Sequence, residues 1–211
     1  MPTDSRPTLV IGTHNRKKGL ELVDLLAPRG FSIVTLGDIP SAIEVVEDGD
    51  TFEANARLKA SQQARHLGEW VLADDSGLAV DALGGAPGVY SARFAGPTAD
   101  DEANNRLLLE KLASTPLEKR TAHYVCHVSV ADPTGEIRAE SHDVCHGRIR
   151  TEQAGANGFG YDPLFEVVEY HCTFGELGPH VKRAISHRSR ALRAIVPTLV
   201  AAWNEGQRVS G

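Results

Sequence analysis

The chain has 211 residues, of which 41% are hydrophobic and 24% are charged, and its formal net charge is −6. This composition is typical of a globular protein, and no apolar stretch approaches the roughly 18 residues needed to cross a bilayer, which excludes an integral membrane protein. General nucleic-acid binding normally needs a basic face, so the negative charge argues against it. An anionic small substrate remains compatible with the charge if a metal and a local group of cations bind it.

The three cysteines are predicted to be free thiols. Cys126, Cys145 and Cys172 are odd in number and widely spaced, with no Cys-x-x-Cys pair, which argues against a disulfide framework and a zinc site. We therefore expect reduced thiols in a core. Residues 1–7 lack the apolar centre of a secretory signal, so we predict that they form a disordered lead-in and that the protein is cytoplasmic.

Strands and helices alternate along most of the chain. Apolar runs and alternating segments predict strands over residues 8–12, 31–35, 71–73, 78–80, 123–131 and 137–144. Helical spacing predicts helices before Pro28, over 51–67 and over 99–113, and a last one with Ala191, Leu192, Ile195, Leu199 and Val200 on its inner face. Asp50 and Glu53 have the form of a capping box.

This order of elements predicts an α/β protein with a mixed sheet, because a hairpin turn at residues 132–135 follows the alternating strands and helices. We expect one domain of two lobes over residues 8–203, followed by a polar tail over 204–211.

Two adjacent carboxylates, Asp74 and Asp75, interrupt apolar runs of strand length. Asp-Asp-Ser-Gly at 74–77 predicts a turn, with Gly77 supplying the flexible backbone. Two like charges in a partly dry place repel each other unless a positive group lies beside them, and a divalent metal is the natural candidate. An ordinary solvated turn is the commoner structure for such a segment taken alone.

Thr13-His14-Asn15-Arg16-Lys17-Lys18 lies where a strand turns into a helix. Backbone N–H groups at a helix N-terminus, together with hydroxyl, amide and ammonium donors, are a usual phosphate site. The segment lacks the Walker spacing, which excludes a P-loop. A solvated basic helix face is the alternative, and the local sequence favours it.

Three further segments could add to one site. Glu47-Asp48, in a loop before the helix that carries Lys59, could join the aspartates around Mg²⁺ or could simply be solvated. The loop over 158–163 could stack a nucleobase on its aromatic residue, or be a tight turn. Donors at Lys182 and in Ser186-His187-Arg188 suit phosphate or a carbonyl, although a lone histidine is more often structural.

Six motifs in this order make the chain resemble the inosine/xanthosine triphosphate pyrophosphatase (ITPase) family, also called Ham1-like. They are residues 13–18, 47–52, 73–78, 84–93, 158–163 and 186–188. The resemblance implies a long curved mixed sheet flanked by helices, with two lobes and the active site in the cleft between them, and a homodimer. It also implies hydrolysis of ITP, dITP and XTP to the monophosphate and pyrophosphate, which cleans the nucleotide pool.

The resemblance also implies a role for each matching residue. Asp75 is expected to be the general base, and Mg²⁺ is expected to be held by Glu47 and Asp75, with Asp74 in support. The expected substrate contacts are Thr13, His14, Asn15, Arg16, Lys17, Lys18, Lys59, Ser76, Phe159, Gly160, Tyr161, Asp162, Lys182, His187 and Arg188. Three departures from the family pattern are His14, where glycine is common, the order Glu53-Ala54-Asn55, and Gly178-Pro179-His180-Val181, which lacks the usual acidic residues.

Two other functions stay open at this point. One is a house-cleaning pyrophosphatase for other modified nucleotides, such as a methylated pyrimidine, against which the Ser-His-Arg motif argues. The other is a nucleotide-binding module without turnover, against which the intact Glu47 and Asp75 argue.

Overall fold

The computed structural model describes residues 8–27 and 31–209, with side chains described as far as residue 205. The predicted lead-in over 1–7 and the end of the first helix at Pro28 lie outside the described residues.

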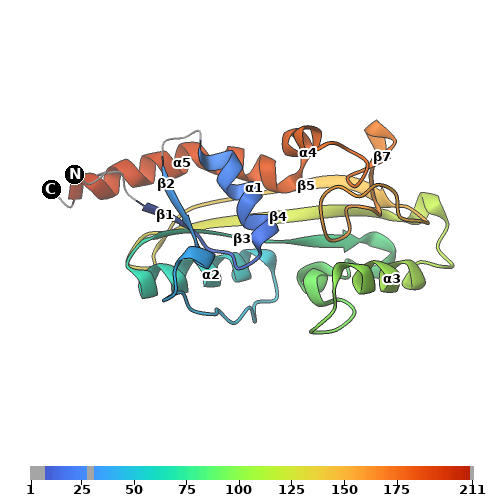
Figure 1. Cartoon of the computed structure of the whole chain (residues 1–211), viewed down its shortest axis with the longest axis horizontal. Coiled ribbons are helices and arrows are strands. Elements are labelled where there is room, and N and C mark those ends of the chain that lie inside the picture. Colours follow the sequence, from blue (N-terminus) through green and yellow to red (C-terminus); the bar gives the residue numbers. More distant parts are fainter. Residues whose placement is uncertain (1–7, 28–30, 210–211) are drawn as a thin grey trace. The chain divides into compact units, whose positions relative to one another are not determined.

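The strands form one seven-stranded sheet in the order β2-β1-β3-β4-β5-β6-β7 (Figure 1). Their bounds are β1 Thr8–Ile11, β2 Ser32–Thr35, β3 Trp70–Val80, β4 Thr121–Ala131, β5 Ile137–Ile149, β6 Phe165–Val167 and β7 Cys172–Thr173. β1 is parallel to β2 and β3, whereas β6 is antiparallel to β5 and β7. The predicted mixed sheet of an α/β protein is therefore confirmed.

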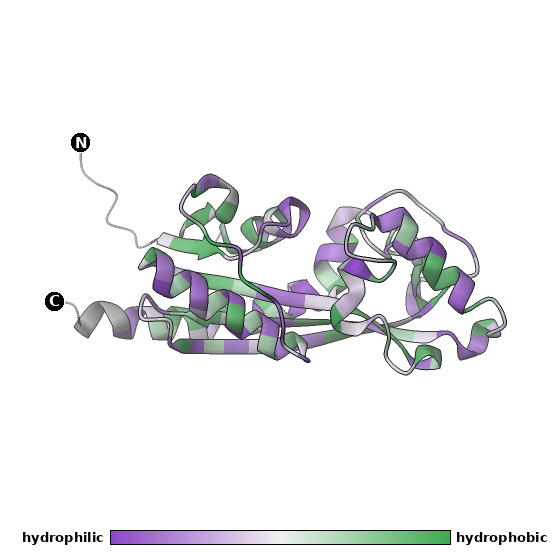
Figure 2. Cartoon of the chain, turned by 90° about the horizontal axis from the view of Figure 1, so that it is seen from below, coloured by the Kyte–Doolittle hydropathy of each residue, from purple (hydrophilic) through white to green (hydrophobic). Residues whose placement is uncertain are grey.

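Five α-helices and five short 3₁₀ helices connect the strands of the described chain. The α-helices are α1 Arg16–Leu26, α2 Phe52–Leu67, α3 Asp101–Lys111, α4 Pro179–Ile185 and α5 His187–Val209. The 3₁₀ helices are η2 Leu36–Asp38, η3 Asp81–Leu83, η4 Gly88–Arg93, η5 Leu117–Lys119 and η6 Val168–Tyr170. The helices carry both hydrophilic and hydrophobic segments (Figure 2), as expected of helices with one buried face. Among the described residues, no helix combines the length and the apolar character that crossing a bilayer requires.

Several helix boundaries differ from the prediction. The N-cap of α2 is Thr51, whose Oγ1 accepts the N–H of Ala54 at 3.1 Å, so the capping box predicted at Asp50 is wrong. The threonine side chain lies where the N–H groups of the first turn can reach it. α5 continues to Val209, past the predicted domain end at residue 203, and Val200 is 38% exposed rather than on the buried face.

The largest correction concerns Asp-Asp-Ser-Gly, which lies inside β3 and not in a turn. The strand runs without interruption from Trp70 to Val80, and every residue in it except Ser76 is buried. β3 lies between β1 and β4 in the sheet, and its first residues, Trp70 to Leu72, pair with β1. Tertiary pairing of this kind overrides the local preference of Asp, Ser and Gly for turns.

The described chain divides into two compact units. The first comprises the described residues of Met1–Asp75, His127–His142 and Ala191–Gly211, and the second comprises Ser76–Cys126 and Asp143–Arg190. The unit boundaries fall inside β3, β4, β5 and α5. Asp75 and Ser76, which are consecutive in β3, therefore belong to different units.

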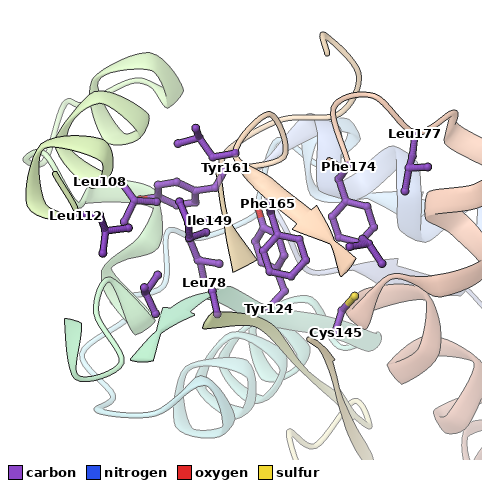
Figure 3. Packing of buried hydrophobic residues seen from close by; sticks show 14 residues of the cluster. Leu78, Leu108, Leu112, Tyr124, Cys145, Ile149, Tyr161, Phe165, Phe174 and Leu177 are labelled. Atoms are coloured by element: carbon purple, nitrogen blue, oxygen red, sulfur yellow. The ribbon is translucent and has the colours of Figure 1, made fainter. Parts of the chain in front are cut away.

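Each unit has its own apolar core. In the first unit, Val10, Leu36, Ala60, Ala64, Val71, Ala73 and Ala131 form a buried cluster. The second unit has a larger cluster, in which the rings of Tyr124, Phe165 and Phe174 lie close together (Figure 3). Their ring centroids are 4.7 Å apart for Tyr124–Phe165 and 5.4 Å apart for Phe165–Phe174.

The cysteines are free thiols, as predicted. Cys126 and Cys145 are buried and Cys172 is half-buried. Burial raises the pKa of the Cys145 thiol to about 11, so this thiol stays protonated at neutral pH.

Candidate active site

In the first unit, one ammonium group joins the two carboxylates predicted to hold a metal. Lys59 Nζ lies 2.9 Å from Asp75 Oδ1 and 2.9 Å from Glu47 Oε2. Asp75 is only 7% exposed, and burial raises the pKa of its carboxyl against the opposing attraction of Lys59. Burial lowers the pKa of Lys59, but the surrounding carboxylates outweigh it and raise the pKa. Lys59 therefore carries its charge at neutral pH.

Asp74 has a different cation beside it. Lys18 Nζ lies 3.9 Å from Asp74 Oδ2, and the side chain of Asp74 is fully buried. The two adjacent aspartates are thus placed against two separate lysines, one from α1 and one from α2.

Glu47 and Asp75 fit a Mg²⁺ ion by their chemistry. Each places a carboxylate oxygen 2.9 Å from Lys59 Nζ, so two oxygen ligands of the kind that Mg²⁺ prefers already lie beside one positive charge, the Lys59 ammonium. Mg²⁺ is commonly held by one or two carboxylates together with waters and substrate phosphates. Among residues 8–27 and 31–209, no three His, Cys, Asp or Glu side chains gather closely enough to hold a metal. The three carboxylates predicted to hold the metal, Glu47, Asp74 and Asp75, therefore do not form one such group.

Asn55 belongs to this cluster and was not predicted as a site residue. Its Nδ2 lies 3.4 Å from Asp75 Oδ2, and its Oδ1 accepts the N–H of Gly49 at 2.8 Å. Asn55 precedes Lys59 by four residues, so both lie on one face of α2. That spacing is the signal by which the sequence could have indicated it.

The predicted phosphate segment is built around a helix cap. Asn15 is the N-cap of α1, and its Oδ1 accepts the N–H groups of Lys17 at 3.0 Å and Lys18 at 3.1 Å. These backbone donors, which were predicted to hold phosphate, are therefore engaged by the protein itself. Thr13 and Lys18 are half-buried, and the remaining members, His14, Asn15, Arg16 and Lys17, are exposed.

In the second unit, two cations surround the predicted base-binding aromatic residue. Lys182 Nζ lies 4.7 Å from the centre of the Phe159 ring, and the Arg188 guanidinium lies 5.7 Å from it. Lys182 Nζ also donates to Asp162 Oδ2 at 2.7 Å, and Arg188 Nη2 donates to Ser76 Oγ at 2.7 Å. Five of the predicted substrate contacts thus form one connected group.

His187, another predicted base contact, is stacked on an aromatic ring of the protein. The imidazole of His187 lies parallel to the Tyr124 ring, with centroids 4.7 Å apart and an interplanar angle of 7°. His187 is buried.

The loop that carries Phe159 is held by its neighbours. The Gly160 N–H donates to Asp101 Oδ2 at 2.9 Å, and its carbonyl accepts from Asn105 Nδ2 at 3.0 Å. Gly160 was expected to contact the substrate, but both polar groups of its backbone are engaged by α3. Tyr161 is buried and donates its hydroxyl to the Ser91 carbonyl at 2.8 Å, so its side chain supports the loop.

Glycine is required at the start of this loop. Gly158 has a φ of +77°, and a Cβ atom there would lie 1.9 Å from Asp162 Oδ2. The Asp162 carboxylate accepts the Phe159 N–H at 2.8 Å, so the close approach serves a bond within the loop.

Comparison with known proteins decides the family. The sequence model described as the Ham1 family matches residues 9–198. The chain belongs to the Ham1 family. The predicted resemblance is thereby confirmed over nearly the whole chain.

Curated Ham1-family relatives match most of this chain. A dITP/XTP pyrophosphatase of Rhodopirellula baltica is 56% identical over 91% of this chain and 92% of its own length. A second protein with that name, from Desulforamulus reducens, is 50% identical over 90% of this chain and 94% of its own length.

Solved Ham1 structures share the fold. The HAM1 protein of Coxiella burnetii has a TM-score of 0.83 and 36% identity, and it covers 92% of this chain and 98% of its own. The Ham1 protein of Staphylococcus aureus has a TM-score of 0.79 and 38% identity, and it covers 95% of this chain and 99% of its own.

The predicted site residues of this Ham1 chain fall into two groups, one in each unit. The first unit holds residues 13–18, Glu47, Lys59, Asp74 and Asp75, and the second holds Ser76, residues 159–162, Lys182, His187 and Arg188. The peptide bond between Asp75 and Ser76 joins the two groups covalently.

Proposed function

We propose that this chain is a Mg²⁺-dependent nucleoside triphosphate pyrophosphatase that hydrolyses deaminated purine nucleotides, namely ITP, dITP and XTP, to the monophosphate and pyrophosphate. The observation that carries the proposal is the cluster in which Lys59 lies 2.9 Å from both the buried Asp75 and the exposed Glu47. Family membership and the names of its relatives support the same reaction class.

Asp75 is the proposed general base. Its carboxylate is buried, and burial raises its pKa, which makes it a better proton acceptor than an exposed aspartate. In this role Asp75 accepts a proton from the water that attacks the α-phosphorus, and pyrophosphate is the leaving group.

The lysines are proposed to stabilise the negative charge that develops on the pyrophosphate. Lys59 and Lys18 each lie beside a buried aspartate in the first unit, so both positive charges are available near the proposed base. Glu47 and Asp75 would hold Mg²⁺, which when bound supplies charge that neutralises the triphosphate. We assign Lys182, predicted as a phosphate contact, to the base-binding group instead, because it lies on Phe159 and Asp162.

Base selection is proposed to depend on the second unit. Phe159 offers an aromatic face for stacking, and Arg188 and His187 supply donors for the 6-carbonyl of hypoxanthine or xanthine. Adenine carries an amino group at that position, and a mispaired buried donor costs about 1–3 kcal/mol. Guanine shares the 6-carbonyl, so its rejection needs a contact at the 2-position.

A panel assay tests the function. Pyrophosphate release is measured with ITP, XTP, dITP, GTP and ATP at equal concentration, each with Mg²⁺ and with EDTA. We expect release from the three deaminated purine nucleotides and little from ATP, and no release in EDTA. ITP binding without pyrophosphate release in any condition would instead favour the nucleotide-binding module, and preference for a methylated pyrimidine triphosphate would favour the other house-cleaning activity.

The homodimer and the cytoplasmic location also stay predictions. Light scattering coupled to size exclusion tests the first, with a mass near twice that of the 22.7 kDa chain as the expected result. Localisation of a tagged full chain by fractionation tests the second.

A further inference from the structure

We infer that Asn55 is a positioning residue that ties the Glu47 loop to Asp75 and thereby sets the geometry of the two proposed metal-binding carboxylates. The inference rests on the proposed function, because it concerns the same site. Asn55 is 1% exposed, and its amide makes one contact to each side of that site.

The hydrogen-bond partners fix the orientation of the Asn55 amide. The Gly49 N–H needs an acceptor, and it lies 2.8 Å from Oδ1. The carbonyl oxygen is the only acceptor of an asparagine side chain, so the NH₂ group must face the other way. There it lies 3.4 Å from Asp75 Oδ2, where a carboxylate can only accept.

α2 therefore supplies a separate donor to each oxygen of Asp75. Lys59 donates to Oδ1 at 2.9 Å, and Asn55, one helical turn earlier, faces Oδ2. Contacts to both oxygens limit rotation of the carboxylate about its last bond. The plane of the Asp75 carboxylate is thereby set by two residues of one rigid helix.

The other half of the Asn55 amide holds the loop. Gly49 follows Glu47 by two residues, and a Cβ at Gly49 would lie 2.7 Å from both Asn55 Oδ1 and Ala54 Cβ. The loop backbone thus approaches α2 so closely that only glycine fits. The side chain of Glu47 is itself 38% exposed, so the tether at Gly49 keeps its carboxylate near Lys59.

Loss of the tether should weaken metal binding more than base recognition. Residues that orient metal ligands typically change metal affinity by about 10–100-fold when they are replaced. For Asn55→Ala we expect Mn²⁺, a probe for Mg²⁺, to bind about tenfold more weakly. The Mg²⁺ concentration for half-maximal pyrophosphate release should rise by a similar factor, while the KM for ITP at saturating Mg²⁺ should change less than twofold.

The direct readout is Mn²⁺ binding, measured by electron paramagnetic resonance on the full chain with a non-hydrolysable ITP analogue. Asn104→Ala is the matched control, because Asn104 is also buried in a helix, α3, and its amide also has one partner for the oxygen and one for the NH₂ group, the Ala95 N–H at 2.8 Å and the Ala92 carbonyl at 3.2 Å. A general effect of losing a buried asparagine would appear in both variants. We expect the Asn104→Ala protein to bind Mn²⁺ as the wild type does.

Gly49→Ala is the second variant, in case Asn55→Ala does not fold. It leaves Asn55 in the chain but pushes the loop from it, so it should weaken Mn²⁺ binding in the same direction. The inference is overturned if the folded variants bind Mn²⁺ as tightly as the wild type does. It is also overturned if the wild type is active but does not bind Mn²⁺. A wild type that releases no pyrophosphate from ITP overturns the proposed function instead, so the two failures are distinguishable.

Discussion

Lys59 Nζ lies 2.9 Å from Asp75 Oδ1, and the side chains are only 13% and 9% exposed. Lys59 is placed by α2 and Asp75 by β3, so the pair joins a helix to the sheet within the first unit. A buried charge pair of this kind gives little net stability, because removing both groups from water opposes their attraction. Under the proposed function, its value is that it places the proposed base beside a cation.

Replacement of Asp75 by Asn is expected to abolish turnover. The amide keeps the shape of the side chain but cannot accept the proton, and loss of a general base typically costs about 10²–10⁴-fold in rate. Pyrophosphate release from ITP measures the loss, and calorimetry with the same nucleotide measures binding, which should persist. An active Asp75→Asn protein would show that another group is the base.

Lys59→Met is expected to lower kcat for ITP about 100-fold, because the substitution removes a cation that faces the developing negative charge. The same change leaves Glu47 and Asp75 as two carboxylates without the ammonium between them. Steady-state kinetics at saturating Mg²⁺ checks the rate. Lys119→Met, which removes a cation of η5 in the second unit, is the matched control and should keep the wild-type rate.

Arg188→Lys is expected to reduce the preference for ITP over ATP about tenfold, since lysine keeps the charge but loses the planar fork of donors. Arg188 is buried and bonds Ser76, so its guanidinium has a defined orientation. The ratio of kcat/KM for the two nucleotides measures the effect. An unchanged ratio, with the protein folded, would remove Arg188 from base selection.

Glu140→Gln is expected to destabilise the protein at neutral pH and not in strong acid. Burial raises the pKa of Glu140, but hydrogen bonds from Arg57, Ser129 and His127 outweigh it and lower the pKa to about 2. A carboxyl group whose pKa is lowered by folding stabilises the folded protein at pH values above its pKa in the unfolded chain, which is near 4.5. The contribution is then lost as the pH falls from about 4.5 towards 2.

Urea unfolding of the wild type and the Glu140→Gln protein at pH 7, 5 and 3.5 checks this prediction. The difference in unfolding free energy should be constant between pH 7 and 5 and smaller at 3.5. A difference that does not change with pH would contradict an ionic role for Glu140.

The chemistry of the residues and much of the secondary structure could be read from the sequence alone. α2 and the hairpin of β4 and β5 lie close to their predicted positions, because helical spacing and turn residues act over short distances. The order of the motifs also indicated the family, because six short sequence segments can be recognised without knowledge of the fold.

Only the tertiary structure decided how the site residues meet. Asp-Asp-Ser-Gly has a turn sequence, yet it lies inside β3, where membership of the sheet and burial keep it part of a strand. Gly49, Asn55 and Asp75 come from a loop, a helix and a strand, and the amide that links them is visible only when those elements pack. Local sequence sets propensities worth fractions of a kcal/mol per residue, whereas strand pairing and burial act together over distant segments and prevail where the two conflict.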